Sequence, residues 1–264
     1  MKMILPEIDI IGTGNLAANL APALEQSGFV INNIYGRSIN SAKYIADRLY
    51  QATATDNLDF SSSRSMVFLI AIADDSIEEV ARELIVPENA IVAHTSGSKS
   101  ISILGYTASP NIGVFYPLQT FSKLKRVPFG QVPILIEGDN SFTEKILMAM
   151  SKKISKTVRK ATSKQRLMIH LAAIFASNFT NAMLIHANEL MAKAQSDIQL
   201  LAPLVEETIQ KSMALGPEQA QTGPASRGDL MVLDEHLEML ENFPVMQETY
   251  RLISQQILDR NEAN

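Results

Sequence analysis

A short strand, a glycine-containing turn and the start of a helix follow one another at residues 8–17, which read IDIIGTGNLA. This segment constrains the fold more than any other in the chain. Its isoleucines are typical of a strand buried within a parallel sheet. Gly12 permits a tight turn out of that strand, Gly14 leaves room for a pyrophosphate to approach the backbone, and Ala17 permits close packing of the helix on the strand. The order of strand, turn and helix makes the pattern more specific than the three small residues alone.

The helix after this turn presents its free N–H groups and the positive end of its dipole at one point, which suits a diphosphate. We therefore expect a dinucleotide to bind here, and the alternative interpretation is a glycine turn without a ligand. The cofactor contacts predicted within the turn are Gly12, Thr13, Gly14, Asn15 and Leu16.

The second predicted strand, at residues 30–35, ends in Gly36, Arg37 and Ser38. In a dinucleotide-binding fold, the adenine ribose lies about 20 residues past the glycines, and an acidic residue there binds the 2′-hydroxyl of NAD. This chain instead offers a guanidinium and a hydroxyl, which suit a 2′-phosphate. We therefore predict NADP(H) as the cofactor, bound by Arg37 and Ser38. A surface arginine at a strand end is the alternative.

Two further strand ends carry small polar residues. One predicted strand runs into Ala73 and Asp74 before a helix begins, and the next opens into His94, Thr95 and Ser96. The carboxyl ends of parallel strands form the ligand-binding edge of such a sheet. We expect Ala73, Asp74, Thr95 and Ser96 to contact the cofactor, and Ser96 to contact substrate as well, although helix capping also explains Asp74. His94 is a candidate catalytic acid, with a structural histidine as the alternative.

Strands and helices alternate up to about residue 161, which predicts an α/β fold with a doubly wound parallel sheet of the Rossmann type. No strand pattern remains after residue 163, and a helix is expected to run unbroken to about residue 194. We therefore predict a nucleotide-binding domain over residues 1–161, followed by an all-α domain over residues 162–264.

Polar residues interrupt the apolar sequence of this long helix. At 100° per residue, His170, Ser177, Asn181 and Asn188 share one narrow stripe, and Asn178 lies to one side of it. Such a stripe is either hydrogen-bonded to other helices or lines a cleft that faces the cofactor. We take Asn178 and Asn181 as catalytic candidates and His170 as a candidate substrate contact.

A segment rich in glycine and proline follows at residues 222–229 and carries Arg227. A guanidinium in such a loop suits a substrate carboxylate. A salt bridge from Arg227 to Asp229 or Asp234 is the alternative interpretation.

The composition excludes several classes of function. The net charge of -5 argues against a nucleic-acid partner, and the 46% hydrophobic content suffices for a sizeable core. The chain has no cysteine, which excludes disulfides and thiolate metal sites and fits a reducing compartment. No signal-peptide pattern opens the chain, and the polar residues of the long helix argue against a bilayer span. We expect a cytoplasmic protein with no metal, nucleic-acid or membrane partner.

Several motifs resemble a bacterial family of NADP oxidoreductases that joins a Rossmann-like domain to a DUF2520 domain. They are IGTGNLA at residues 11–17, GRS at 36–38, HTSG at 94–97, YPLQTF at 116–121, FASNF at 175–179 and TGPASRGD at 222–229. The resemblance spans nearly the whole chain. More distantly, the layout is similar to pyrroline-5-carboxylate reductase, coenzyme F420-dependent NADP oxidoreductase and the 6-phosphogluconate dehydrogenase superfamily.

The resemblance implies hydride transfer between NADP(H) and a small substrate, in a homodimer built largely from the helical domains. The cofactor positions carry over onto Gly12, Gly14, Asn15, Leu16, Arg37 and Ser38. The catalytic positions do not, because no lysine precedes Asn178 or Asn181 by the four residues seen in the β-hydroxyacid dehydrogenase branch. The resemblance therefore narrows the class of reaction and not the substrate.

From the sequence we expect an NADPH-dependent oxidoreductase that acts on a small polar carbonyl or imine. An oriented amide polarises a carbonyl without titrating, which makes an asparagine a reasonable catalytic group. The alternative is an NADP-binding sensor or assembly protein without turnover, since no unmistakable acid–base pair appears in the sequence.

Overall fold

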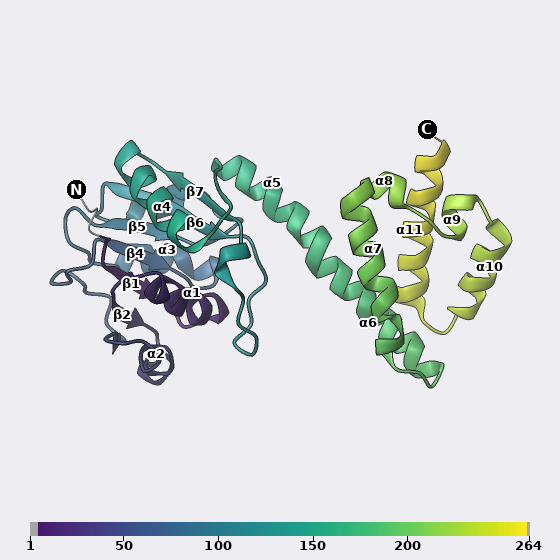
Figure 1. The fold of residues 1–264 in the computed structure, drawn as a ribbon, viewed down its shortest axis with the longest axis horizontal. Coiled ribbons are helices and arrows are strands. Elements are labelled where there is room, and N and C mark those ends of the chain that lie inside the picture. Colours follow the sequence, from purple (N-terminus) through teal and green to yellow (C-terminus); the bar gives the residue numbers. More distant parts are fainter. Residues whose placement is uncertain (1–4, 263–264) are drawn as a thin grey trace. The chain divides into compact units, whose positions relative to one another are not determined.

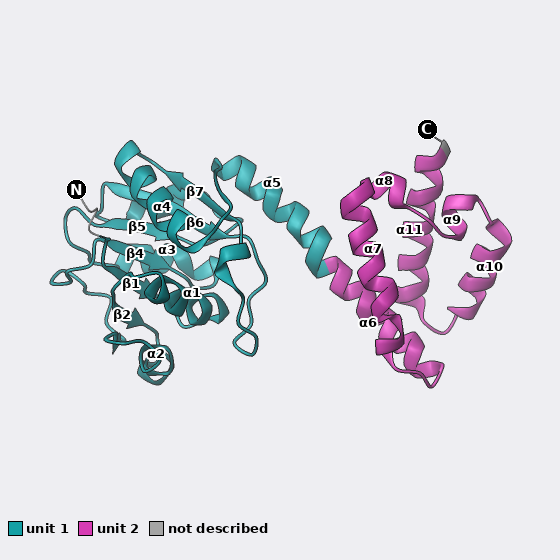
Figure 2. Cartoon of the chain, in the orientation of Figure 1, with its two compact units in different colours: residues 1–178 teal, residues 179–264 magenta. Residues whose placement is uncertain are grey.

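The computed structural model describes residues 5–262 and divides into two compact units, residues 1–178 and 179–264 (Figure 2). The first unit is built on a sheet and the second contains helices. Along the chain, the boundary between the two units falls within one long helical segment. The domain boundary expected at residues 161 and 162 stays a prediction.

Within the described residues, eight strands of the first unit form one sheet in the order β3-β2-β1-β4-β5-β6-β7-β8 (Figure 1). β1 and β4 are neighbours, and from them the chain winds outward in both directions, which creates the switch point where α/β sheets bind ligands. The strands are β1 (Ile8–Ile11), β2 (Ile31–Tyr35), β3 (Thr53–Thr55), β4 (Val67–Ile70), β5 (Ile91–His94), β6 (Asn111–Pro117), β7 (Ile134–Gly138) and β8 (Val158–Lys160).

Both faces of the sheet are covered by buried apolar clusters. Neighbouring residues of a strand point to opposite sides, so a single strand such as β1 contributes to both clusters. Ile8 and Ile10 pack into one buried cluster, whereas Ile11 packs into the other. Helices α1 (Asn15–Gln26), α2 (Ile39–Ala46) and α4 (Ser141–Ile154) contribute to the first cluster. Helix α3 (Ile77–Glu83) and the 3-10 segment η2 (Ile101–Tyr106) contribute to the second. The predicted α/β fold with a Rossmann-type sheet is confirmed.

One strand departs from the all-parallel sheet expected from the sequence. β7 pairs antiparallel with β6, with Phe115 opposite Ile136. A parallel pair needs a crossover connection, usually a helix. The segment between β6 and β7 contains only the 3-10 turn η3 (Phe129–Gln131), so the chain returns in the opposite direction. After β7, helix α4 provides such a crossover and β8 is again parallel.

The long helix begins with a capping box. The Thr162 side chain accepts from the backbone of Gln165, and the Gln165 side chain accepts from the backbone N–H of Thr162. The helix then runs as α5 (Ser163–Ala173), a π-helical turn η4 (Ile174–Phe179) and α6 (Thr180–Lys193). The expected unbroken α-helix is therefore wrong at η4. A π turn adds a residue to the repeat, so the projected stripe of His170, Asn181 and Asn188 does not continue across it.

The second unit consists of α6 and a set of further helices. They are η5 (Ile198–Leu201), α7 (Ala202–Leu215), α8 (Pro217–Ala220), α9 (Pro224–Arg227), α10 (Leu230–Met239) and α11 (Pro244–Glu262). The prediction that only helices follow β8 is confirmed for the described residues.

By length and composition alone, one helical segment in the described chain could cross a membrane. This segment, Ser163–Lys193, has a mean hydropathy of 1.4 over its most apolar window, and none of that window is buried within the chain. It also carries polar side chains at His170, Ser177, Asn178 and Asn181.

Candidate nucleotide and substrate site

The turn after β1 is fixed by a very close approach between two backbones. Gly12 has φ +136°, and a Cβ placed on it would lie 2.1 Å from the carbonyl oxygen of Ala71. The Gly12 N–H also donates to the carbonyl of Tyr35 at 2.8 Å. Only glycine combines this φ with this contact, so Gly12 sets the path of the chain from β1 into α1.

Gly14 plays a different part in the same turn. Its φ is -74°, which any residue adopts, and the nearest atom to a Cβ placed there is the Ala71 oxygen at 4.0 Å. The missing side chain therefore leaves open space at the N-terminus of the 12-residue helix α1. This space and the free N–H groups of the first helical turn fit a diphosphate.

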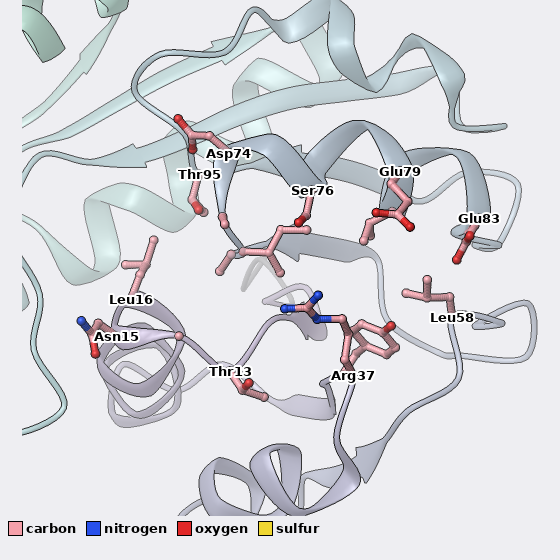
Figure 3. A pocket seen from close by; sticks show the side chains of 16 residues that line it. Thr13, Asn15, Leu16, Arg37, Leu58, Asp74, Ser76, Glu79, Glu83 and Thr95 are labelled. Atoms are coloured by element: carbon pink, nitrogen blue, oxygen red, sulfur yellow. The ribbon is translucent and has the colours of Figure 1, made fainter.

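A cavity of about 580 Å³ begins at this turn and lies along the carboxyl ends of β1, β2, β4 and β5. Figure 3 shows Leu16, Asp74 and Thr95 toward one end, and Leu58 and Glu83 toward the other. The predicted cofactor contacts that line it are Thr13, Gly14, Asn15, Leu16, Arg37, Ala73, Asp74 and Thr95. The structure thus brings together residues from four separate stretches of sequence.

Arg37 is the second residue after β2 and is exposed to solvent. Its guanidinium points into the cavity between the end of β2 and helix α3 (Figure 3). Gly36 beside it is required by packing, because a Cβ there would lie 2.6 Å from a methyl carbon of Thr13. The glycine turn and the strand that delivers Arg37 therefore pack against each other.

Three predicted cofactor contacts do not line this cavity: Gly12, whose part in the turn is described above, and two serines. Ser38 is the N-cap of α2, and its carbonyl accepts from the N–H groups of Ser41 and Ala42. The Ser96 hydroxyl oxygen accepts from the N–H groups of Ser98 at 3.1 Å and Lys99 at 3.0 Å. In this structure, both serines therefore hold the local turns in which they lie.

Sequence reasoning missed one wall of the cavity, which comes from one face of α3 and the turn before it. Its residues Ser76, Glu79, Val80 and Glu83 follow the three- and four-residue spacing of one helical face. That spacing was visible in the sequence, but nothing in it indicated that this face borders a ligand site. Other lining residues missed are Tyr35, Leu58, Ala71 and Ile72.

His94 lies at the end of β5 and is completely buried. Its Nδ1 accepts a hydrogen bond from the Ser96 N–H at 3.1 Å. Burial, and then the positive charge of Arg166, lower the pKa of His94 to about 4. A neutral, enclosed imidazole does not suit the catalytic acid expected from the sequence, and we assign His94 a structural role.

A second cavity, of about 320 Å³, lies between the end of β6 and the C-terminal part of the first unit's long helix. Tyr116 and His170 face it, and the Tyr116 hydroxyl lies 3.0 Å from His170 Nδ1. Asn178 also lines this cavity from the π turn, the kind of irregularity that often marks functional sites. His170 and Asn178 thus share a pocket as substrate-site candidates should. Asn181 belongs to the second unit.

Arg227 ends the short helix α9 of the second unit and pairs with Asp229 at 2.8 Å. This ion pair is the alternative that the sequence left open. Both side chains are substantially exposed, so the pair is readily rearranged by a ligand. A role for Arg227 in substrate binding stays a prediction.

Comparison with known families identifies both parts of the chain. A model for a Rossmann-like domain matches residues 3–112, and a model for a domain of unknown function, DUF2520, matches residues 132–257. A solved structure from Bacteroides fragilis, described as a "putative NADP oxidoreductase", is 37% identical over 97% of this chain and 98% of its own, with a TM-score of 0.88. The chain belongs to the Rossmann-like/DUF2520 family.

More distant solved structures share the fold of this DUF2520 protein. Protein TM1727 from Thermotoga maritima is 23% identical, with 97% of this chain and 98% of the other covered and a TM-score of 0.72. A reductive aminase from Aspergillus terreus, solved with NADPH and ethyl levulinate, is 12% identical, with coverage of 97% and 95% and a TM-score of 0.73. No functionally curated protein matches the sequence.

The lowered pKa of His94 predicts a specific dependence of stability on pH. Below pH 6.5, the unfolded chain protonates His94 while the folded chain does not until about pH 4. The unfolded state then binds more protons than the folded state. The free energy of unfolding therefore decreases as the pH is lowered from 6.5 to 4, by roughly 3 kcal/mol in all. Chemical denaturation at pH 7 and pH 4.5 measures the loss, and a His94→Asn variant should lose less between the two. An equal loss in both proteins would contradict the assignment.

Proposed function

We propose that this DUF2520-family protein is an NADPH-dependent oxidoreductase that reduces a small carbonyl or imine compound. The observation that carries the proposal is one cavity in which the open space at Gly14 and the guanidinium of Arg37 both occur. A diphosphate suits the first and a 2′-phosphate suits the second. The 37% identical relative carries the description "putative NADP oxidoreductase", which supports the same cofactor.

The cavity supports one orientation of the cofactor. With the 2′-phosphate at Arg37, the adenosine lies beside Leu58 and the exposed face of α3. The diphosphate then lies at Gly14, and the nicotinamide lies toward Asp74 and Thr95. When bound, NADPH supplies the hydride that reduces the substrate. The protein's own residues must bind and orient the substrate and provide the proton.

Asn178 supports the substrate side of the proposal, because it lines the second cavity of the first unit together with Tyr116 and His170. A side-chain amide there donates a hydrogen bond to a carbonyl oxygen without changing its charge. Asn181, the other catalytic candidate, and Arg227, a candidate substrate contact, both belong to the second unit, and their roles remain proposals.

A sensor that binds NADP without turnover is the competing function. It is supported by the neutral, enclosed state of His94, which removes the acid expected from the sequence. Tight NADPH binding without oxidation of NADPH on any aldehyde, ketone or cyclic imine would favour the sensor.

Replacing Arg37 with glutamine tests the cofactor assignment. Charge-assisted hydrogen bonds to a phosphate contribute about 1.5–3 kcal/mol, so we expect NADPH to bind roughly 10- to 100-fold more weakly. The affinity for NADH, which lacks the 2′-phosphate, should change by less than about threefold. Calorimetric titration measures both constants. Arg159→Gln, at an exposed arginine of β8 outside the cavity, serves as the control. Equal losses for the two nucleotides would refute the role of Arg37.

We further propose that the protein forms a homodimer through its helical unit. Many large apolar side chains of this unit are exposed, among them Leu200, Leu204, Met213, Met231, Met239 and Val245. Met213 and Met231 are 77% and 80% exposed. Apolar exposure of this extent is typical of a protein interface rather than of a monomer's surface. The polar residues of α5 and α6 favour a protein partner over a bilayer.

Charges on α7 test the dimer. Leu204 and Met213 lie on different faces of this helix, so the double variant Leu204→Glu/Met213→Glu places a carboxylate on each. We expect the wild-type protein to have twice the monomer mass in sedimentation equilibrium, and the double variant to shift toward the monomer. Gln210→Glu adds a charge at an exposed polar position of α7 and should leave the mass unchanged. A monomeric wild-type protein at tens of micromolar would refute the proposal.

A further inference from the structure

The Tyr116 hydroxyl and the His170 ring form a hydrogen-bonded pair that no part of the nucleotide site uses. The hydroxyl lies 3.0 Å from Nδ1, and the two rings meet edge-on, with centroids 6.0 Å apart and an interplanar angle of 72°. Tyr116 is near the end of β6, whereas His170 is on α5, so the fold brings together residues 54 positions apart. Both side chains are half-buried and both line the second cavity.

The loop after β5 is shaped to receive this pair. A Cβ on Gly97 would lie 2.6 Å from His170 Nδ1, 2.6 Å from the Tyr116 ring and 2.8 Å from the Tyr116 hydroxyl oxygen. Gly97 is buried, and its φ is not in the left-handed region. The reason for glycine here is therefore the space that the pair occupies, and not the backbone conformation.

The same loop connects the pair to the nucleotide cavity. Thr95, two residues before Gly97, lines that cavity, as does Asp74. Ser98, the residue after Gly97, donates a hydrogen bond to Asp74 at 2.5 Å. The loop that packs against the pair therefore borders the cavity at Asp74 and Thr95. Figure 3 shows these two residues at the end of the cavity away from Leu58 and Glu83. On the proposed orientation of NADPH, on which this inference rests, that is the nicotinamide end.

His170 is held firmly by the first turn of α5. Arg166, one helical turn before it, is completely buried and forms an ion pair with Glu137 of β7. Arg166 also donates to the carbonyl of Lys99, in the loop that carries Gly97. The Ser163 hydroxyl donates to Glu137 at 2.8 Å. A buried, multiply bonded guanidinium is costly to displace, so it fixes α5 against the sheet and His170 against Tyr116.

The second cavity favours a neutral substrate. Its described lining combines apolar side chains with uncharged polar ones and contains no lysine, arginine, aspartate or glutamate. The apolar members are Leu118, Ala173, Ile174 and Ala176, and the uncharged polar ones include Gln119, Thr120, Ser177 and Asn178. Among these lining residues a carboxylate would find no lysine or arginine as a partner, which is unfavourable.

We propose that Tyr116 is the catalytic acid of this site, that His170 positions it and returns its proton, and that the substrate is a small uncharged carbonyl or imine compound. As the carbonyl carbon accepts the hydride, its C=O π bond breaks, and the oxygen takes the proton of the Tyr116 hydroxyl. The resulting tyrosinate takes the Nδ1 proton of neutral His170 while Nε2 of the same ring accepts a proton from a hydronium ion or buffer acid of the solvent, so the imidazole stays neutral and only its tautomer changes. The net change is one hydride and one proton added to the substrate, with NADPH oxidised to NADP⁺.

The environment of Tyr116 is consistent with this role. Burial, and then the negative charge of Asp74, raise the pKa of the Tyr116 hydroxyl above its ordinary value of 10. The resting hydroxyl therefore keeps its proton at neutral pH. A neighbouring imidazole that can return the proton is then needed, because the tyrosinate is not stable there.

Tyr116→Phe tests the proposal, since it removes only the hydroxyl. We expect at least about a 100-fold loss of turnover, the usual effect of losing a general acid, with NADPH affinity unchanged within about threefold by calorimetry. In protein labelled with ¹⁵N-histidine, the His170 Nδ1 resonance should shift. Tyr50→Phe, at a tyrosine 92% exposed, should change none of these. The probes are cyclohexanone, butanal and 1-pyrroline, with pyruvate as the charged comparison.

A second variant separates catalysis from structure. If the pair acts as a unit, His170→Phe should lower turnover, and Tyr116→Phe/His170→Phe should lower it no further than Tyr116→Phe alone. Turnover by Tyr116→Phe within threefold of wild type would overturn the role of Tyr116. Turnover confined to pyruvate, or NADPH binding without turnover of any uncharged probe, would overturn the substrate class. Failure of the wild-type protein to bind NADPH would instead contradict the proposed function.

Discussion

The contact between Gly12 and the carbonyl of Ala71 is the constraint on which the rest of the site depends. At φ +136° and with no side chain to keep the two backbones apart, Gly12 lets β1 turn into α1 directly beside the end of β4. This turn places the open position of Gly14 at the N-terminus of α1, at the switch point of the sheet. The cavity along the carboxyl ends of the strands follows from that geometry.

The two ends of the site are built from different chemistry. Arg37 provides a positive charge on the side toward Leu58 and Glu83, where the cavity wall also includes Glu79. At the other end, the loop after β5 packs Gly97 against the Tyr116–His170 pair, next to a pocket lined by uncharged side chains. On the proposed function, the charge that would bind a phosphate and the neutral hydrogen-bonding groups that would face a reacting carbonyl are thus kept apart along one edge of the sheet.

The sequence predicted the sheet and most of the nucleotide cavity because both depend on local patterns. A few neighbouring residues suffice to interpret each of them: the isoleucines of β1, the spacing of the glycines after it, and the position of Arg37 after β2. The antiparallel β7 and the π turn could not be predicted, since they depend on how a loop returns and how a helix packs. Tyr116 was missed for the same reason: only the fold brings its hydroxyl to His170, across 54 residues. His94 was a candidate catalytic acid in the sequence, with a structural histidine as the alternative, and its complete burial favours the structural role.

Calorimetric titration of NADPH into the wild-type protein and a Gly14→Val variant tests the central claim most directly. A side chain at Gly14 enters open space and leaves the backbone unstrained, so the variant should fold with an unchanged Tm while its side chain occupies the proposed diphosphate position. The account predicts saturable heat for the wild-type protein and none for the variant at the same concentrations. No heat from the wild-type protein, or equal affinity in both, would contradict it.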